Sequence, residues 1–379
     1  MIGPRDIKDI LRTSSAKPII NRIMNGEYPS PSEAYELFKV QGREIYLLAY
    51  IADQIREIQV GSAISYVVNL NLNFTNICTK NCLFCAYSVP PQSPNGFFEI
   101  SEDFIIEKIK LTHPYEITEV CIQGGIHPHS SFETYLQLLR RLRRIKPTIH
   151  IHAFSPQEIY HAAQTAELTI QEVLREFKQA GLDSVPGTAA EILDDEIRRL
   201  ICPNKINTTQ WLNVIKTAHE LAIPTTSTIM FGHIETPKHW IGHLELLKKL
   251  QEDTCGFTEL IPLPFISKNT LLAQKYPSKL LHMTHLDYLK FYAVSRLFLG
   301  EVIPNLQTSW VKLGFPLAQL TLNAGCNDIG GTLFEENITR SAGGVYGQVV
   351  TPSEIQSLIS TMGRPFKQRD TLYNFFSNP

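Results

Sequence analysis

The sequence predicts an α/β fold: a parallel (βα)8 barrel of the TIM type with a helical lead-in at the N-terminus. From residue 63 onward, short apolar or β-branched runs alternate with longer segments of helical period. Most predicted strand starts are about thirty to forty-five residues apart, the length of one βα unit. Polar residues follow the ends of successive strands, and a barrel gathers those ends around one mouth. An open doubly wound sheet is less economical because no G-x-G-x-x-G turn and no P-loop occurs in the sequence.

The elements are expected in the following order. Residues 1–60 form a helical extension, in which Ile45, Leu48, Ile51 and Ile55 give an apolar stripe of helical period. Residues 61–345 form the barrel, and residues 346–379 form a C-terminal helical segment. The eight strands expected in the barrel are Ser65–Phe74, Glu119–Ile122, Ile149–Phe154, Ser184–Val185, Pro224–Phe231, Phe257–Leu263, Asn305–Trp310 and Leu320–Asn323.

Composition excludes several classes of protein. With 379 residues, 43% of them hydrophobic and 19% charged, the chain has enough apolar material for a globular core. A net charge of −2 provides no general attraction for nucleic acid or for an anionic membrane. The basic run Arg140 to Arg144 follows three leucines and is typical of a solvated helix face. No signal peptide and no membrane span is evident, so we expect a cytoplasmic protein.

Three of the seven cysteines, Cys78, Cys82 and Cys85, lie within eight residues directly after the first strand. Structural zinc needs four ligands, commonly from two paired knuckles, and the sequence has a single C-x2-C pair here. Three thiolates spaced C-x3-C-x2-C instead suit a [4Fe–4S] cluster in which one iron lacks a protein ligand. Three core cysteines that are adjacent by chance are the structural alternative.

The C-x3-C-x2-C loop, with Phe84 before its last cysteine, resembles the radical S-adenosylmethionine (SAM) superfamily. The resemblance implies that SAM binds the open iron and is cleaved by one electron to methionine and a 5′-deoxyadenosyl radical. It also implies a SAM site made by Gln123, Gly124 and Gly125 after the second strand, by Glu191, and by the backbone from Met230 to Gly232. Glu191 as a carboxylate at a helix start and Met230 as a core residue are the structural alternatives.

Within the superfamily, the chain resembles the subgroup that makes deazaflavin and futalosine intermediates, and most of all the family of FO synthase second subunits. The segments that carry the resemblance to the subgroup are Asn76–Cys78, Cys85–Tyr87, Ile122–Pro128, Gly181–Leu193, Ser309–Gly314 and Asn323–Thr332. Those that resemble the second subunits most are Gly187–Glu191 and Glu335–Ile338.

That family resemblance implies a transferase of coenzyme F420 biosynthesis. L-Tyrosine loses a hydrogen from its amine, its Cα–Cβ bond breaks, and the 4-hydroxybenzyl group joins C5 of 5-amino-6-(D-ribitylamino)uracil. The implied partners are these two substrates, a reducing electron donor, and FO synthase subunit 1, a second radical SAM enzyme that closes the ring.

Substrate contacts are predicted among polar residues at the strand ends. For the third strand we expect His150 and His152 to point to opposite faces, with His152 facing the cavity. A buried structural histidine is the alternative for His152, and loop capping is the alternative for the others. The predicted substrate-binding residues are His127, His152, His233, Gln307, Asn327, Asp328 and Glu336.

Two other functions remain open from the sequence. One is a sister radical SAM enzyme of futalosine-type menaquinone biosynthesis, because few positions separate the two subgroups. The other is a non-enzymatic metal or redox module that uses the same three cysteines.

Overall fold

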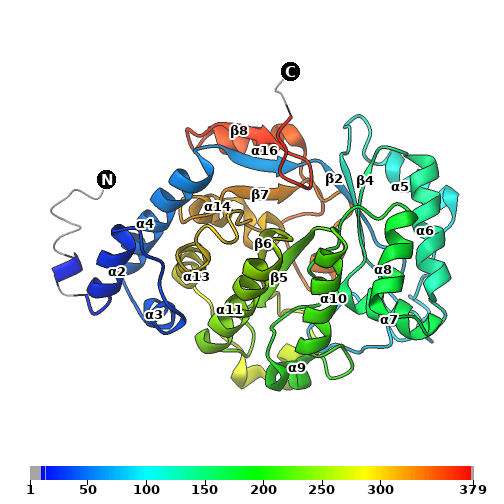
Figure 1. Cartoon of the computed structure of the whole chain (residues 1–379), viewed down its shortest axis with the longest axis horizontal. Coiled ribbons are helices and arrows are strands. Elements are labelled where there is room, and N and C mark those ends of the chain that lie inside the picture. Colours follow the sequence, from blue (N-terminus) through cyan, green and yellow to red (C-terminus); the bar gives the residue numbers. More distant parts are fainter. Residues whose placement is uncertain (1–9, 13, 377–379) are drawn as a thin grey trace.

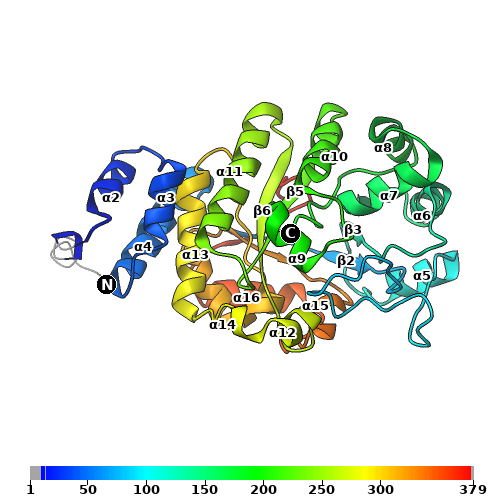
Figure 2. The same cartoon turned by 90° about the horizontal axis from the view of Figure 1, so that it is seen from below.

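The computed structural model describes residues 10–12 and 14–376. It contains helices around parallel strands, with α3 and α4 packed at one side of the barrel against α11 and α13, and α2 farther out (Figures 1 and 2). The helices are α2 (Lys17–Met24), α3 (Pro31–Leu37), α4 (Arg43–Val60), α5 (Glu102–Lys110), α6 (Phe132–Ile145), α7 (Pro156–Ala166), α8 (Ile170–Gln179), α9 (Asp195–Ile201), α10 (Thr208–Glu220), α11 (Pro237–Thr254), α12 (Leu271–Lys275), the 3-10 turn η1 (Pro277–Lys279), α13 (His285–Leu299), α14 (Trp310–Leu322), α15 (Ile338–Ser341) and α16 (Pro352–Ser360).

Eight parallel segments close the predicted barrel. The regular strands are β1 (Ile64–Val67), β2 (Asn69–Leu72), β3 (Glu119–Ile122), β4 (His150–Ala153), β5 (Thr225–Phe231), β6 (Phe257–Pro264), β7 (Asp328–Gly331) and β8 (Phe366–Gln368). Strand β2 pairs with β3 and β3 with β4, β5 pairs with β6, and β7 pairs with β1. Single bridges at Ser184, Val185, Leu306 and Gln307 join these groups. The two segments around these bridges act as the fourth and seventh barrel strands, while β1 and β2 together form the first and β8 lies outside the eight. The predicted (βα)8 architecture is confirmed.

Local sequence explains where many helices begin. Ser155, Thr169 and Thr351 each cap a helix, and a glutamate three residues later bonds back to the capping residue. This capping box satisfies backbone N–H groups that the first helical turn leaves without partners. Helix α6 shows the matching packing pattern, since Leu138, Leu139 and Leu142 are buried while Arg140 and Arg144 remain exposed.

The first and last predicted barrel strands differ from the structure. The first is divided at Val68 into β1 and β2. The last was placed at Leu320–Asn323, which is wrong, because Leu320 to Leu322 end α14 and the strand is β7. Buried Leu313, Leu317 and Leu322 give that segment a helical stripe. The glycines of β7 are typical of a turn and conceal the strand in the sequence. The strand needs a glycine at 331, because a Cβ there would lie 2.0 Å from Asn69 Oδ1 on the neighbouring strand.

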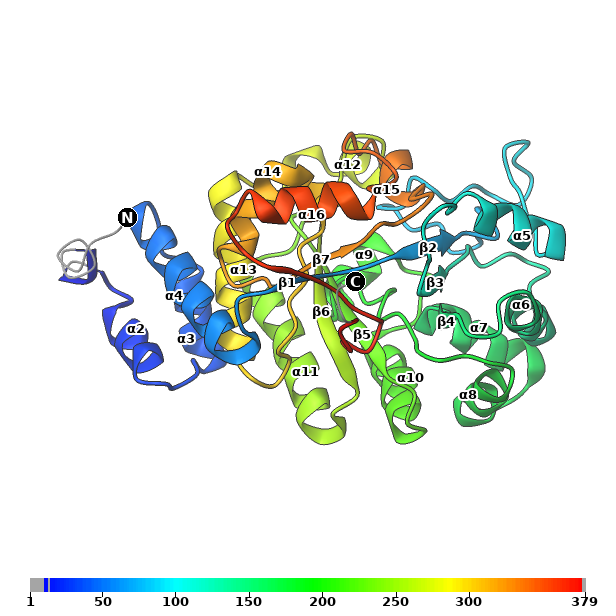
Figure 3. The same cartoon turned by 90° about the horizontal axis from the view of Figure 1, so that it is seen from above.

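The chain termini differ in how they meet the barrel. Helices α2, α3 and α4 lie in the predicted helical extension, whose first nine residues are outside the described part of the chain. The predicted C-terminal helical segment contains one helix, α16, and then strand β8, which pairs in parallel with β1 (Figure 3). A purely helical C-terminus is therefore incorrect. Strand β3 pairs with β2 and not with β1, and β8 pairs with the edge of β1 that this leaves open. Within residues 10–12 and 14–376, no helix has the length and apolar content to cross a bilayer.

Buried histidines make the fold sensitive to acid. His243 on α11 is fully buried; its Nδ1 accepts from Leu193 N at 2.9 Å and its Nε2 donates to Thr228 O at 3.0 Å. These contacts require the neutral ring, and burial lowers the pKa of His243 to about 3. Because the pKa is lower in the folded than in the unfolded state, this stabilisation is present above about pH 6.5 and is lost as the pH falls.

We expect the unfolding free energy to decrease between about pH 6.5 and pH 5 by up to ~1.4 kcal/mol per pH unit from this group. Denaturant titrations of the wild type and His243→Asn would measure it. The variant should be less stable at about pH 7 and should show a shallower pH dependence. An identical slope in both proteins would contradict the assignment.

Candidate active site

A cavity of about 320 Å³ runs through the barrel from the strand ends to the strand starts. Alternate residues of each strand face it, as Asn69, Asn71 and Asn73 show along β2. The register with β3 places Glu119 beside Asn69 and Cys121 beside Asn71. The strand starts thus contribute a polar lower layer, and the strand ends contribute the layer nearest the cysteine loop.

The cysteine loop follows β2 and is anchored by backbone hydrogen bonds. Cys78 N donates to Val89 O at 3.0 Å, and Leu83 N donates to Ile201 O at 2.8 Å. The sulfur of Cys78 lies 3.3 Å from Ile126 N and 3.5 Å from Lys80 N, which both donate to it. Such N–H donors favour a thiolate and are the outer-shell contacts that orient a metal ligand.

At Cys82, burial and a neighbouring cation act on the thiol in opposite directions. Burial raises the pKa of the Cys82 thiol, and the ammonium of Lys205 opposes that rise. Burial also disfavours the charged form of Lys205, but Glu191 and Cys82 outweigh burial and raise its pKa. A permanent buried cation therefore lies beside the ligand set. Among the described residues, no three Cys, His, Asp or Glu side chains converge on one metal ion. A cubane cluster does not require that, because each thiolate binds a different iron.

Two glycines after β3 support this loop. A Cβ at Gly125 would lie 2.2 Å from Ile77 O, and one at Gly124 would lie 2.6 Å from the Phe74 ring. Gly125 N also donates to Thr75 O at 3.0 Å. The glycines are therefore needed for the close approach of β3's end to the cysteine loop, independently of any ligand.

Glu191 sits in a tight bend and does not open a helix, since α9 begins at Asp195. Its φ of 44° is in the left-handed region, and its carboxylate lies 2.8 Å from Lys205 Nζ. The other carboxylate oxygen, Oε2, is buried without a hydrogen-bond partner, and so are Thr188 Oγ1 and Asn73 Oδ1. All three residues line the cavity. These unpartnered groups fit the ribose and amino groups of SAM, because buried polar atoms need partners.

The structure brings together part of the predicted site. Those of the predicted cofactor and substrate residues that line the cavity are Gln123, His152, Glu191, Met230, Gln307 and Glu336, together with Cys85 of the cysteine loop. Gly232 lies just beyond β5 with a φ of 87°, and its backbone N–H donates to Glu235.

Four predicted substrate residues are elsewhere. The His127 ring stacks on Phe98 with centroids 4.5 Å apart, and His127 Nδ1 accepts from His129 N. His233 is fully buried with its Nδ1 2.8 Å from Glu235 Oε2. Asn327 and Asp328 bond to Arg296 and Arg369, respectively. These side chains serve turns and buried ion pairs and do not line the cavity.

His150 and His152 were expected on opposite faces, which is wrong. His150 Nε2 and His152 Nδ1 each lie 2.7 Å from the Ser184 hydroxyl, because residues two apart in a strand share a face. One hydroxyl has one proton, so Ser184 donates to one ring and accepts from the other. Burial lowers the pKa of His152 to about 4, and this ring is neutral at physiological pH.

Several cavity residues were missed. Because every second residue of a strand faces the same side, Gln123 at the cavity also implies Cys121 and Glu119. In the same way, Asn73 implies Asn71 and Asn69. No sequence signal identifies Arg369, which comes from the C-terminal segment. The other polar residues of the cavity wall that were not predicted as ligand contacts are Thr188, Thr226, Thr228, Glu259, Ser309, Lys312 and Thr339.

Comparison with known proteins gives two family matches. Residues 72–247 match the radical SAM superfamily, and residues 254–379 match the CofH/MqnC C-terminal region. The chain is 49% identical to 5-amino-6-(D-ribitylamino)uracil–L-tyrosine 4-hydroxyphenyl transferase of Archaeoglobus fulgidus, over 86% of this chain and 92% of the relative. Proteins of the same name from Methanothermobacter thermautotrophicus and Methanocaldococcus jannaschii are 44% and 46% identical, covering 94% and 91% of this chain and 96% of each relative.

Solved structures agree on the fold. Methylornithine synthase (PylB) matches with a TM-score of 0.67 at 16% identity, covering 91% of this chain and 96% of that one. The [FeFe]-hydrogenase maturase HydG matches with a TM-score of 0.72 at 14% identity, covering 96% and 79%.

The contacts of Gly125 generate a test of the cysteine loop. We expect Gly125→Ala to lower the iron content and the broad visible absorbance of reconstituted protein, because the new methyl group displaces the Ile77 backbone beside Cys78. The matched control is Gly242→Ala on α11, where a Cβ meets no atom within 4 Å. Full iron content in Gly125→Ala, with only SAM binding weakened, would show that the glycine serves the ligand and not the loop.

Proposed function

The chain belongs to the family of 5-amino-6-(D-ribitylamino)uracil–L-tyrosine 4-hydroxyphenyl transferases in the radical SAM superfamily, and from this we propose how its residues perform the transfer. The reaction joins the 4-hydroxybenzyl group of L-tyrosine to the ribitylated uracil in deazaflavin biosynthesis. The observation that carries the assignment is the similarity of almost the whole chain to these transferases, together with a three-cysteine loop at the mouth of a closed barrel.

The cofactors are a [4Fe–4S] cluster and SAM. In the proposed arrangement, Cys78, Cys82 and Cys85 hold the cluster and leave one iron open. Glu191, Gln123 and Met230, which line the cavity, would hold SAM, with the backbone at Gly124, Gly125 and Gly232 shaping the site behind them, and Glu191 Oε2 would accept a hydrogen bond from a ribose hydroxyl. When bound, the pair supplies a 5′-deoxyadenosyl radical from one-electron cleavage of SAM.

The cavity wall orients the substrates and excludes water. Lys312 lines the cavity and is half-buried, and its Nζ donates to Thr339 Oγ1 at 3.2 Å. Desolvation lowers the pKa of Lys312, and the charge of Glu336 opposes that change. We propose that Lys312 binds the tyrosine carboxylate, with Gln307 nearby in the same wall. Neutral His152 offers its ring to the uracil edge, and its orientation is set by Ser184.

The reaction has further requirements beyond this chain. A reducing protein or dithionite-like donor must supply one electron to the cluster. We propose that the coupled product passes to FO synthase subunit 1 for ring closure. The seven cysteines are free thiols, and the cluster ligands must stay reduced, which suits the cytoplasm.

The cluster assignment predicts a clear pattern among cysteine variants. Cys78→Ala, Cys82→Ala and Cys85→Ala should each abolish SAM cleavage, because each removes one of three protein ligands. Cys255→Ala, at an exposed helix end, should retain it. 5′-Deoxyadenosine formation by dithionite-reduced, anaerobically reconstituted protein measures the effect. Wild-type cleavage by any of the first three variants would contradict the assignment.

The proposed reaction predicts that reduced enzyme with SAM, tyrosine and the ribitylated uracil forms 5′-deoxyadenosine together with glyoxylate from the hydrolysed imine. Phenylalanine should be a poorer substrate by about 1–3 kcal/mol, because a pocket that bonds the phenol would keep an unpaired polar group. Mass spectrometry of the coupled product checks this. 5′-Deoxyadenosine formation that ignores tyrosine but responds to a futalosine-type nucleoside would replace the function.

A further inference from the structure

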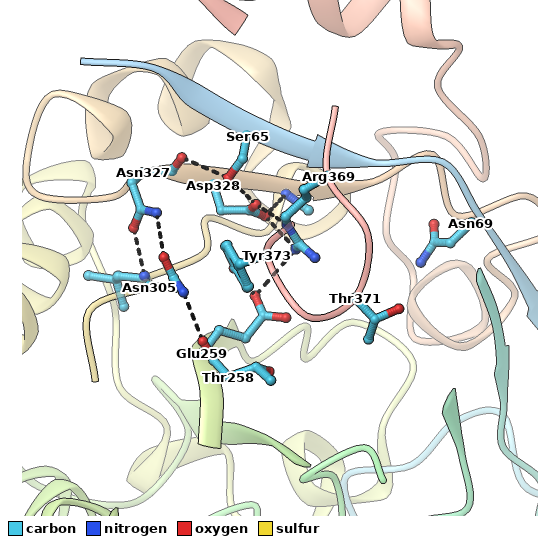
Figure 4. Close-up of polar contacts among 12 residues, drawn as sticks. Ser65, Asn69, Thr258, Glu259, Asn305, Asn327, Asp328, Arg369, Thr371 and Tyr373 are labelled. Atoms are coloured by element: carbon cyan, nitrogen blue, oxygen red, sulfur yellow. Dashed lines mark hydrogen bonds and ion pairs between the residues drawn. The ribbon is translucent and has the colours of Figure 1, made fainter. Parts of the chain in front are cut away.

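The C-terminal segment closes the bottom of the barrel. After β8, Arg369 N donates to Tyr66 O at 2.9 Å, and the chain then turns beneath the strand starts. Its side chains attach to three different strands: Arg369 to Asp328 of β7 and Tyr373 to Glu259 of β6 (Figure 4), and Thr371 to Glu119 of β3. Two of these residues, Glu119 and Glu259, line the cavity, as does Arg369.

Arg369 is committed to the protein itself. Its Nε lies 2.5 Å and its Nη2 3.0 Å from the two carboxylate oxygens of Asp328, and the Tyr373 ring lies 4.1 Å from its guanidinium carbon. Its nearest contact with Glu259 is longer, 3.5 Å. A bidentate ion pair buried on all sides is costly to break, so Arg369 is not available to bind a substrate carboxylate.

The two cavity carboxylates have spare capacity to accept hydrogen bonds. Glu119 accepts from Asn69 Nδ2 at 3.0 Å and from Thr371 Oγ1 at 2.6 Å, and Glu259 Oε2 accepts from Tyr373 Oη at 2.7 Å. Within the described residues, no hydrogen bond to Glu259 Oε1 is present. Since each carboxylate oxygen can accept two hydrogen bonds, acceptors remain that face the cavity.

The floor and the cluster end of the cavity differ in chemistry. Four residues of extended strand separate Glu119 from the level of Gln123, or ~13 Å at 3.3 Å per residue. The floor presents carboxylate acceptors, and its guanidinium, Arg369, is paired with Asp328, so a substrate carboxylate finds no free cation there. Lys312 provides a cation elsewhere in the wall. A neutral chain of hydroxyl donors matches the floor, whereas an amino acid does not.

Resting on the proposed function, we propose that Glu119 and Glu259, held by the C-terminal segment, bind the hydroxyl groups of the ribityl chain and so direct the uracil ring up toward the cluster. The segment from Arg369 to Tyr373 is then part of the substrate site, and its residues act as positioning groups. Recognition of the polyol at the floor sets which uracil is accepted.

The test uses Glu259→Gln in the full-length holoenzyme. We expect the KM for 5-amino-6-(D-ribitylamino)uracil to rise about tenfold with the KM for tyrosine unchanged, because the amide replaces one of the two acceptor oxygens with an N–H donor. Equilibrium dialysis of the uracil against unreduced protein should show the same weakening without turnover. The matched control Glu133→Gln makes the same change at an exposed residue of α6 and should leave this KM unchanged.

A substrate analogue separates recognition from structure. With the ribityl chain replaced by n-pentyl, wild-type affinity should fall at least tenfold, and Glu259→Gln should bind the analogue as well as the wild type does. Equal weakening in Glu133→Gln and Glu259→Gln, a parallel rise in the tyrosine KM, or undiminished binding of the pentyl analogue would overturn the inference. Failure of the transferase assignment would instead appear as wild-type protein without tyrosine-dependent turnover, while dialysis still reports on the floor.

Discussion

Closure of eight parallel segments is the constraint on which the rest of this structure depends. Because of this closure, every second side chain of each strand points into one lumen, and all strand ends lie at one mouth. Every second residue of a strand therefore contributes its side chain to the lumen wall, as Asn69, Asn71 and Asn73 do. Both openings are then closed by segments outside the strands: the cysteine loop at the mouth and the C-terminal segment at the floor.

At the floor of the cavity, the C-terminal segment is fixed by the ion pair of Arg369 with Asp328 and not by apolar packing. Removing Arg369 and Asp328 from water is expensive, and the bidentate geometry with the added bond from Ser65 to Asp328 offsets that cost. Such a network has one satisfied arrangement, so it ties the C-terminal segment to β3, β6 and β7 in a single position. Burial raises the pKa of Glu259, and the positive charge of Arg369 opposes that rise.

The mouth is organised differently, by backbone contacts and close approach. Gly124 and Gly125 let the end of β3 touch the cysteine loop, and N–H groups from two parts of the chain point at Cys78. Lys205 contributes a buried positive charge next to Cys82 and Glu191. Local loop geometry thus positions the cysteine thiols to bind a cluster. The side-chain oxygens of Glu191 and Thr188 that lack a hydrogen-bond partner face the cavity.

The sequence alone determined the βα alternation, the barrel and the three-cysteine loop, because strand and helix periods and cysteine spacing are local properties. It also located Gln123, Glu191 and Gln307 at the cavity through their places at strand ends. Tertiary structure decided the rest. The apolar run at Leu320 was helical because its buried stripe packs as part of α14, and β7 was hidden by glycines that its neighbour Asn69 requires. Arg369 reaches the lumen only because β8 pairs with β1, a contact between residues some three hundred positions apart that no local pattern encodes.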